Sequence, residues 1–379
     1  MNPSQRKILL GAQPRFAAKF DGASYLRNAN PVGMDLSGGE MIGDSDNKTF
    51  EVTKGNWADN GNHSAVRDTT YHHSGVASLK IVASGAGDNI TNFESLPASA
   101  FATIVSGNKF TKEVWAYGST SGITLTMRIG DQVVTGKVVY NAAAGTFTKL
   151  VFNFLATSST VAQPIQLYAS GAGTIWIDDV SLTQAFDGMG FVAFYGTAVQ
   201  DGGIFVHMNN FGPSSTNNGW ALLTRTSNRL DVDLNDGVNR SANIQTVTYA
   251  NGGWQIIVFT YDRVGNSTLY VNGLLVGSLS ITGIGNVTTA DILAIGKVGT
   301  SGAFCSGSIS ETQFVRFNNI TPYATSIAAQ IYATKHCLPS YPNQVHGGGW
   351  WRFKNGSLRD EWGVNNLSTG ASSVPIVRY

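Results

Sequence analysis

The stretch WQIIVFTYDRVGNSTLYVNGLLVGS, residues 254–278, predicts two matched β-strands joined by a tight turn. Side chains in residues 255–261 alternate between two faces, and both faces are largely apolar. A strand of this kind is covered on both sides, so we place it in the centre of a packed sheet. Asn272-Gly273 is the dipeptide that most strongly favours a two-residue hairpin turn. The regularity of the stretch therefore indicates architecture, and the stretch contains no evident catalytic group.

The composition bounds the class of protein. The chain has 379 residues, of which 42% are hydrophobic and only 13% are charged. This length favours two domains. A net charge of +1 gives no basic stripe for nucleic acid, and no apolar run reaches membrane-spanning length. We therefore expect neither a nucleic-acid partner nor membrane insertion.

Nearly all of the remaining sequence alternates or runs as short β-branched segments between Gly- and Asn-rich turns. One helix is expected at residues 321–337, where Ile327 and Ile331 give an apolar stripe. Because helices do not separate the strands, antiparallel pairing is expected. The sequence thus predicts an all-β fold built from β-sandwiches or jelly rolls.

The opening stretch resembles the laminin-G-like, or concanavalin-A-like, jelly roll. The resemblance lies in Trp254, Tyr261-Asp262, LYVNG at 269–273, DILAIGK at 291–297 and GSISETQFVRFNN at 307–319. Residues 347–368 resemble a terminal segment often found after such domains in gut-bacterial and phage proteins. The strand that should open the domain lies far upstream, in residues 16–26. An intervening stretch of this length favours an inserted domain over a loop.

The intervening residues resemble a second family, the carbohydrate-binding-module-like jelly roll of the galactose-binding type. Phe50-Glu51, His73-Ser74-Gly75 and IDDVSL at 177–182 carry this resemblance. We therefore expect two β-sandwich jelly rolls, the first interrupted by the second. The expected boundaries are an N-terminal arm at 1–14, an outer domain of 15–44 plus 185–379, and an insert at 45–184.

Catalytic motifs for zinc proteases, nucleotide phosphates, dinucleotides and serine hydrolases are absent from the sequence. A glycosidase needs two suitably spaced carboxylates. Asp231 and Asp233 share one strand face, but a solvated outer face is the simpler interpretation. We expect a protein that is not an enzyme, with a polysaccharide-degrading glycosidase as the alternative.

Sugar binding uses aromatic faces together with short polar side chains. Trp115 and Tyr117 share a strand face opposite Val114 and Ala116, and one of these two faces must be the core. The polar loop at 209–220 is either a binding rim or a long hairpin turn. The candidate glycan-binding residues are Trp57, Tyr71, Trp115, Tyr117 and Phe211.

A structural calcium ion is implied by the second resemblance. It would be held by Glu51 with one of Asp178 and Asp179, since calcium prefers hard oxygen ligands. The alternative is that these carboxylates only cap strand ends. Cys305 and Cys337 are either two buried free thiols or one disulfide.

The N-terminal arm places Ile8, Leu9 and Leu10 beside two basic residues, and these three are candidates for docking on a particle. A frayed terminus is the alternative. The arm's apolar run is too short for a signal peptide, which favours folding in a host cytoplasm.

With the phage resemblance, we expect a non-catalytic bacteriophage virion protein, in capsid decoration, a head fibre or the tail. It would bind cell-surface or mucin-type glycans, contact other virion proteins and be present in several copies or as a homo-oligomer. The alternative within this class is a structural cement protein without sugar binding.

Overall fold

The protein folds as two compact units. One combines the segment ending at Leu36 with the segment beginning at Phe186, and the other spans Ser37–Ala185. We call them the outer unit and the inserted unit. The computed structural model describes residues 16–57, 63–84, 89–91, 104–129, 132–157, 165–208, 217–250, 252–298, 303–321, 323–334, 338, 340–341, 344–353, 357–369 and 374–378.

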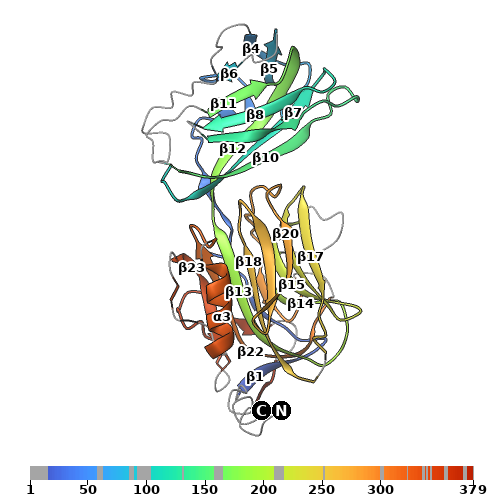
Figure 1. The fold of residues 1–379 in the computed structure, drawn as a ribbon, viewed down its shortest axis with the longest axis vertical. Helices are drawn as coiled ribbons and strands as arrows, with labels where there is room; N and C mark the ends of the chain where they lie inside the picture. The colour runs from blue at the N-terminus through green and yellow to red at the C-terminus, as the bar shows by residue number, and fades with distance from the viewer. Residues whose placement is uncertain are drawn as a thin grey trace. The chain divides into compact units, whose positions relative to one another are not determined.

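The outer unit is an antiparallel β-sandwich of two large sheets (Figure 1). Within the described residues, the eight-stranded sheet runs β20-β19-β18-β13-β22-β1-β25, with β23 also paired to β22, and the seven-stranded sheet runs β17-β16-β15-β14-β21-β2-β24. The first sheet comprises β1 (Phe16–Asp21), β13 (Asp187–Gly196), β18 (Trp254–Tyr261), β19 (Asn266–Val271), β20 (Leu274–Ser280), β22 (Ser306–Phe317), β23 (Gln344–Arg352) and β25 (Ile376–Arg378). The second comprises β2 (Leu26–Asn28), β14 (Gly202–His207), β15 (Asn218–Arg225), β16 (Arg229–Asp236), β17 (Arg240–Thr246), β21 (Leu293–Ile295) and β24 (Ser368–Thr369).

Strand β18 is covered on both faces, as its sequence predicts. Ile257 and Phe259 lie in the core between the two sheets. Ile256 and Val258 lie in a second core on the other side of the eight-stranded sheet. Helix α3 (Ala324–Thr334) covers that side, inside the range expected for the helix (Figure 1).

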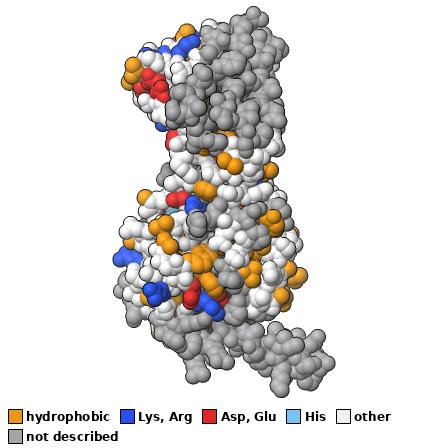
Figure 2. Space-filling view, turned by 90° about the vertical axis from the view of Figure 1, so that its left-hand side faces the viewer, with side chains coloured by type: hydrophobic (Ala, Val, Ile, Leu, Met, Phe, Trp, Pro, Cys, Tyr) orange, Lys and Arg blue, Asp and Glu red, His pale blue; other side chains and the backbone are white. Residues whose placement is uncertain are grey.

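The surface of the outer unit near α3 and β23 is partly apolar. Figure 2 shows hydrophobic side chains gathered on the face that carries α3 and β23, with acidic and basic side chains among them. Trp350 contributes partly exposed surface, and its indole nitrogen donates to Glu311 Oε1 at 2.7 Å. The next residue, Trp351, is fully buried in the core between the sheets. The alternation of β23 thus gives the two tryptophans opposite roles.

The upstream segment belongs to the outer unit. Strand β1 lies between β22 and β25, with Ala18 paired to Ile309 and to Ile376. The boundary between the outer unit and the inserted unit falls earlier in the sequence than expected, however, because β3 (Ser37–Glu40) pairs with β12 of the inserted unit. The boundary therefore lies after Leu36 and not after residue 44.

The inserted unit is also an antiparallel β-sandwich. Within the described residues, one sheet runs β10-β7-β12-β5-β4 with β3 on β12, and the other runs β6-β11-β8-β9. Its elements are α2 (Asp46–Thr49), β4 (His63–Asp68), β5 (Ser78–Ala83), β6 (Asn89–Thr91), β7 (Lys109–Gly118), β8 (Thr124–Ile129), β9 (Gln132–Val138), β10 (Thr148–Leu155), β11 (Ile165–Ala169) and β12 (Gly173–Ala185).

Two further expectations concern cysteines and membranes. Cys305 is a buried free thiol, and burial raises its pKa to about 12; Cys337 lies outside the described residues. In the part of the chain that the structure describes, no helix is long and apolar enough to cross a bilayer.

Candidate functional site

The outward face of the six-stranded sheet in the inserted unit carries large aromatic side chains. Strand β7 turns Val114 and Ala116 into the core, so Trp115 and Tyr117 point away from it. Trp176 on β12 is the backbone partner of Tyr117 and shares that face. This register settles which face of β7 is the core, a question that alternation alone leaves open.

These rings form one connected group, which we call the aromatic cluster. His73 lies flat on Trp115, with ring centroids 3.7 Å apart and planes 12° from parallel. Tyr117 and Trp176 are stacked at 5.2 Å, and Tyr71 meets Trp176 edge-on at 5.0 Å. The cluster consists of Tyr71, His73, Trp115, Tyr117, Phe147 and Trp176.

The cluster has a buried base and an accessible top. Tyr117 and Trp176 are 4% and 6% exposed, yet neither belongs to the core between the sheets. Trp115 and Phe147 are half-buried, and His73 is exposed. The cluster thus places aromatic surface outside the core, and part of that surface is accessible.

Of the sequence candidates, the structure brings Tyr71, Trp115 and Tyr117 together. The prediction that Trp57 is an exposed sugar-binding residue is wrong, because its side chain is only 2% exposed. Trp57 packs on Phe50 in the core, and its indole nitrogen donates to the Asn47 carbonyl. Phe211 lies outside the described residues. Sequence reasoning missed Trp176, although alternation with Asp178 on β12 was a usable signal.

His73 and Phe147 were also missed as members of the cluster. Both belong to turns, His73 before β5 and Phe147 before β10, so neither follows a strand alternation. Only the folded chain shows that these turns reach the aromatic face.

Charged pairs border the aromatic cluster. Asp68 Oδ1 accepts from the Trp176 indole nitrogen at 3.3 Å, and Lys80 Nζ lies 3.6 Å from Asp68 Oδ2. Burial opposes ionisation of Asp68, but hydrogen bonds from Thr70 and Trp176 and the charge of Lys80 outweigh it and lower its pKa. On the other side of the cluster, Lys149 Nζ lies 3.0 Å from Glu113 Oε1.

The three candidate calcium ligands hold the turn that carries His73. Asp178 Oδ2 accepts from the amides of His73 and Ser74 at 2.8 and 3.1 Å. Asp179 Oδ2 lies 2.6 Å from His73 Nδ1, and Glu51 Oε2 accepts from the Val76 amide at 3.0 Å. Burial, together with the charge of Asp179, raises the pKa of Asp178 to about 6 despite its hydrogen bonds.

Calcium therefore stays a prediction. Carboxylate oxygens suit the ion chemically, but the partners of these carboxylates are donors of the 73–76 turn. Among the described residues, no group of three or more His, Cys, Asp or Glu side chains is placed to hold a metal.

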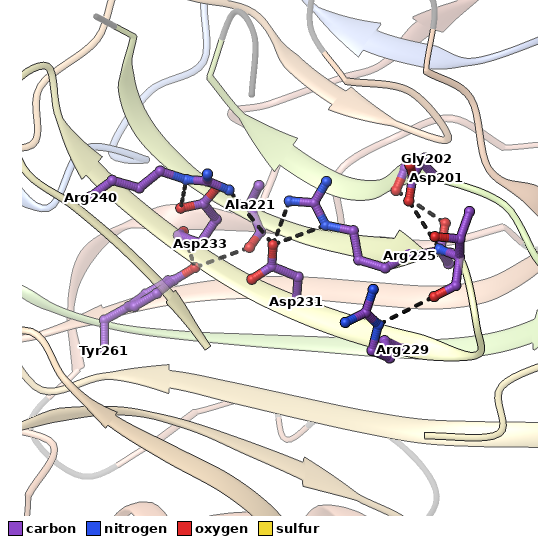
Figure 3. Close-up of polar contacts among 11 residues, drawn as sticks. Asp201, Gly202, Ala221, Arg225, Arg229, Asp231, Asp233, Arg240 and Tyr261 are labelled. Atoms are coloured by element: carbon purple, nitrogen blue, oxygen red, sulfur yellow. Dashed lines mark hydrogen bonds and ion pairs between the residues drawn. The ribbon is translucent and has the colours of Figure 1, made fainter. Parts of the chain in front are cut away.

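The strand carboxylates of the outer unit are not a solvated face, so that interpretation is wrong. Asp231 and Asp233 are fully buried, beneath the side chains of Arg225 and Arg240 (Figure 3). Arg225 Nη2 lies 2.5 Å from Asp231 Oδ2, and Arg240 Nε donates to Asp233 Oδ2 at 2.8 Å. Burial raises the pKa of Asp233 to about 6 against the hydrogen bonds from Arg240, and the charge of Asp231 adds to the shift. The two buried carboxylates and the two half-buried arginines form a row of ion pairs.

Residues 194–317 match the concanavalin A-like lectin/glucanases superfamily. This region runs from within β13 to the end of β22 and includes the hairpin of β18 and β19. A concanavalin A-like, laminin-G-like jelly roll is thus confirmed for the outer unit. Comparison with curated protein sequences finds no match.

Solved structures similar to the chain include three carbohydrate-binding modules. The xylan-binding module of Paenibacillus barcinonensis Xyn10C is 13% identical, over 36% of this chain and 92% of that one, with a TM-score of 0.28. The module of Cellvibrio mixtus lichenase 5A, in complex with cellotriose, is 15% identical over 34% and 92%, with a TM-score of 0.27. The sialyllactose-bound module of Ruminococcus gnavus IT-sialidase is 14% identical over 38% and 83%, with a TM-score of 0.28.

Proposed function

We propose that this is a non-catalytic carbohydrate-binding protein whose glycan lies against the aromatic cluster. The observation that carries the proposal is the position of the cluster: connected rings, outside the core, bordered by polar groups. Ring stacking supplies apolar contact with a sugar face, and polar side chains orient its hydroxyl groups. The cluster members expected to contact the sugar are His73, which is exposed, and Trp115 and Phe147, which keep part of their surface accessible.

The superfamily matched by residues 194–317 takes its name from both lectins and glucanases. The burial of the strand carboxylates Asp231 and Asp233 favours glycan binding over hydrolysis. Asp231 and Asp233 have no exposed surface and are paired with Arg225 and Arg240. In a hydrolase the two carboxylates must be accessible to a water molecule and to the glycosidic bond.

The test is a glycan array probed with the full chain. Trp115→Ala and Phe147→Ala should each lower binding by about 2- to 13-fold, since stacking on one aromatic ring is worth about 0.5–1.5 kcal/mol. Tyr140→Ala is the matched control, because Tyr140 is a 38% exposed aromatic residue of the same unit outside the cluster. Melting curves of all variants show whether folding is intact. Unchanged binding by both cluster variants would exclude this face, and release of reducing sugars would favour the glycosidase.

The particle context is a separate part of the proposal. A phage virion role, with other virion proteins as partners and several copies per particle, is supported by the resemblance of residues 347–368. A cement protein that binds no sugar is the competing structural role. Mass spectrometry of purified phage particles tests whether the protein is present in them, as both roles require. The glycan array then distinguishes a glycan-binding virion protein from a cement protein.

The candidate anchor Ile8, Leu9 and Leu10 lies outside the described residues. Deleting residues 2–13 should leave glycan binding intact and abolish incorporation into particles. Normal incorporation would move the docking surface elsewhere on the chain.

A further inference from the structure

We infer that the aromatic cluster selects uncharged sugars, because the two lysines beside it are already engaged with carboxylates of the same face. This inference rests on the proposed function and names its ligand class. Strand register places both lysines next to rings. Lys149 on β10 is the backbone partner of Trp115, and Lys80 on β5 is the partner of Trp176.

The Lys149–Glu113 pair is nearly inaccessible. The two side chains are 8% and 13% exposed, with Nζ and Oε1 3.0 Å apart. A ligand carboxylate could recruit Lys149 only by drawing it away from Glu113. Glu113 would then be a largely buried carboxylate without a charged partner, which is strongly unfavourable. Lys149 is therefore a poor partner for an anionic sugar.

The Lys80–Asp68 pair is more exposed to solvent, but the charge of Lys80 is likewise balanced by that of Asp68. Lys80 is 33% exposed, and its Nζ lies 5.6 Å from the centre of the Trp176 ring. Asp68 is fixed beside it by the Trp176 indole and the Thr70 amide. An anionic ligand that approached Lys80 would meet the charge of Asp68 at nearly the same distance. The attraction and the repulsion largely cancel.

The third basic side chain that the described residues place at the cluster, His73, also faces a carboxylate. His73 sits on Trp115 with Nδ1 2.6 Å from Asp179 Oδ2, and Ser74 Oγ donates to the other oxygen of Asp179. In the part of the inserted unit that the structure describes, Lys80, Lys149 and His73 thus each face a carboxylate. Neutral hydroxyl groups can still bond to these side chains without breaking an ion pair.

The experiment compares neutral glycans with their sialylated, uronic-acid and sulfated counterparts on one array. The full chain should bind a neutral glycan at least tenfold more strongly than the acidic form of the same backbone. Raising NaCl from about 50 to 500 mM should leave the neutral signal nearly unchanged, because no net charge is neutralised on binding.

Asp68→Asn is the decisive variant. Asparagine keeps an oxygen to accept from Thr70 and Trp176 but removes the charge that compensates Lys80. The variant should gain acidic glycans at least threefold, with a salt-sensitive signal. Asp44→Asn is the matched control: Asp44 is exposed in the same unit and accepts from the amide two residues on, as Asp68 does.

The outcomes separate the two proposals. A wild-type preference for acidic glycans, or an Asp68→Asn variant with an unchanged neutral-to-acidic ratio, would overturn the selectivity and leave carbohydrate binding standing. No signal on any glycan would overturn the proposed function, and the selectivity with it.

Discussion

Gly273 faces the ring of Tyr332 so closely that a β-carbon on residue 273 would lie 2.7 Å from Tyr332 Cδ1. The turn that joins β19 and β20 is therefore packed against helix α3. Asn272 and Gly273 both have positive φ, at 52° and 80°, as a type I′ turn requires. Glycine at residue 273 is thus needed twice, for backbone conformation and for space.

Gly273→Val should accordingly destabilise the outer unit by about 1–3 kcal/mol, from the strained φ of a β-branched residue and from contact with Tyr332. Thermal and urea denaturation measure the loss. Gly283→Val is the control, since a β-carbon at residue 283 meets nothing within 4 Å. Equal stability of the two variants would mean that neither constraint operates.

Arg240→Gln should cost about 3–5 kcal/mol of unfolding free energy. The substitution leaves Asp233 buried without its charged partner, and an uncompensated buried charge is strongly unfavourable. Arg229→Gln removes an exposed arginine from the same strand pair and should change stability by less than about 0.5 kcal/mol. A small effect at both positions would show that solvent reaches Asp233 readily.

The raised pKa of Asp233 predicts a pH dependence with a defined sign. Its ordinary value is 3.8, and burial raises it to about 6 in the folded protein. Between these values the folded state binds a proton that the unfolded state does not. The stabilising contribution is therefore fully present below about pH 4 and is lost as the pH rises through about 6, by at most about 3 kcal/mol.

Urea unfolding of the wild type and of Asp233→Asn at pH 4.5 and pH 7.5 isolates this group. The wild type should gain stability relative to the variant at the lower pH. A difference between the two proteins that is the same at both pH values would show that Asp233 has an ordinary pKa.

Calcium binding predicts that a chelator lowers the melting temperature of the inserted unit. A metal at a hundredfold excess over its dissociation constant stabilises by about 2.7 kcal/mol. Glu51→Ala and Glu51→Gln should both abolish the chelator effect if Glu51 is a ligand. If Glu51 only accepts from the Val76 amide, Glu51→Gln should behave like the wild type and chelation should do nothing.

The sequence predicted the fold more fully than the site. Asn272-Gly273 and the two apolar faces of β18 are local signals, so the hairpin and its central position could be read directly. The interruption could also be inferred, because the opening strand at 16–26 has its partners far downstream. The boundary could not be placed to the residue, since pairing of β3 with β12 is a long-range choice that no local pattern marks.

Site residues were harder to predict because burial is a tertiary property. Trp57 stands in a polar, glycine-rich stretch, and only folding shows that Phe50 and the Asn47 carbonyl receive it in the core. From the sequence, Asp231 and Asp233 are interpreted as surface charges. Only the fold shows that they pair with Arg225 and Arg240. Alternation along β7 correctly puts Trp115 and Tyr117 on the same face. Whether that face is the core or the outer surface depends on the neighbouring strands.

The junction between the units has a consequence for how such a chain could arise. The Phe186 amide donates to the Leu36 carbonyl at 2.9 Å, so the two ends of the outer unit meet where the inserted unit leaves and returns. Ser37 and Ala185 are likewise paired as neighbours on β3 and β12. Because Leu36 and Phe186 are neighbours, a chain in which they are joined directly, without Ser37–Ala185, would keep the backbone path of the outer unit. Adjacent ends of this kind are what allows one domain to be inserted into another.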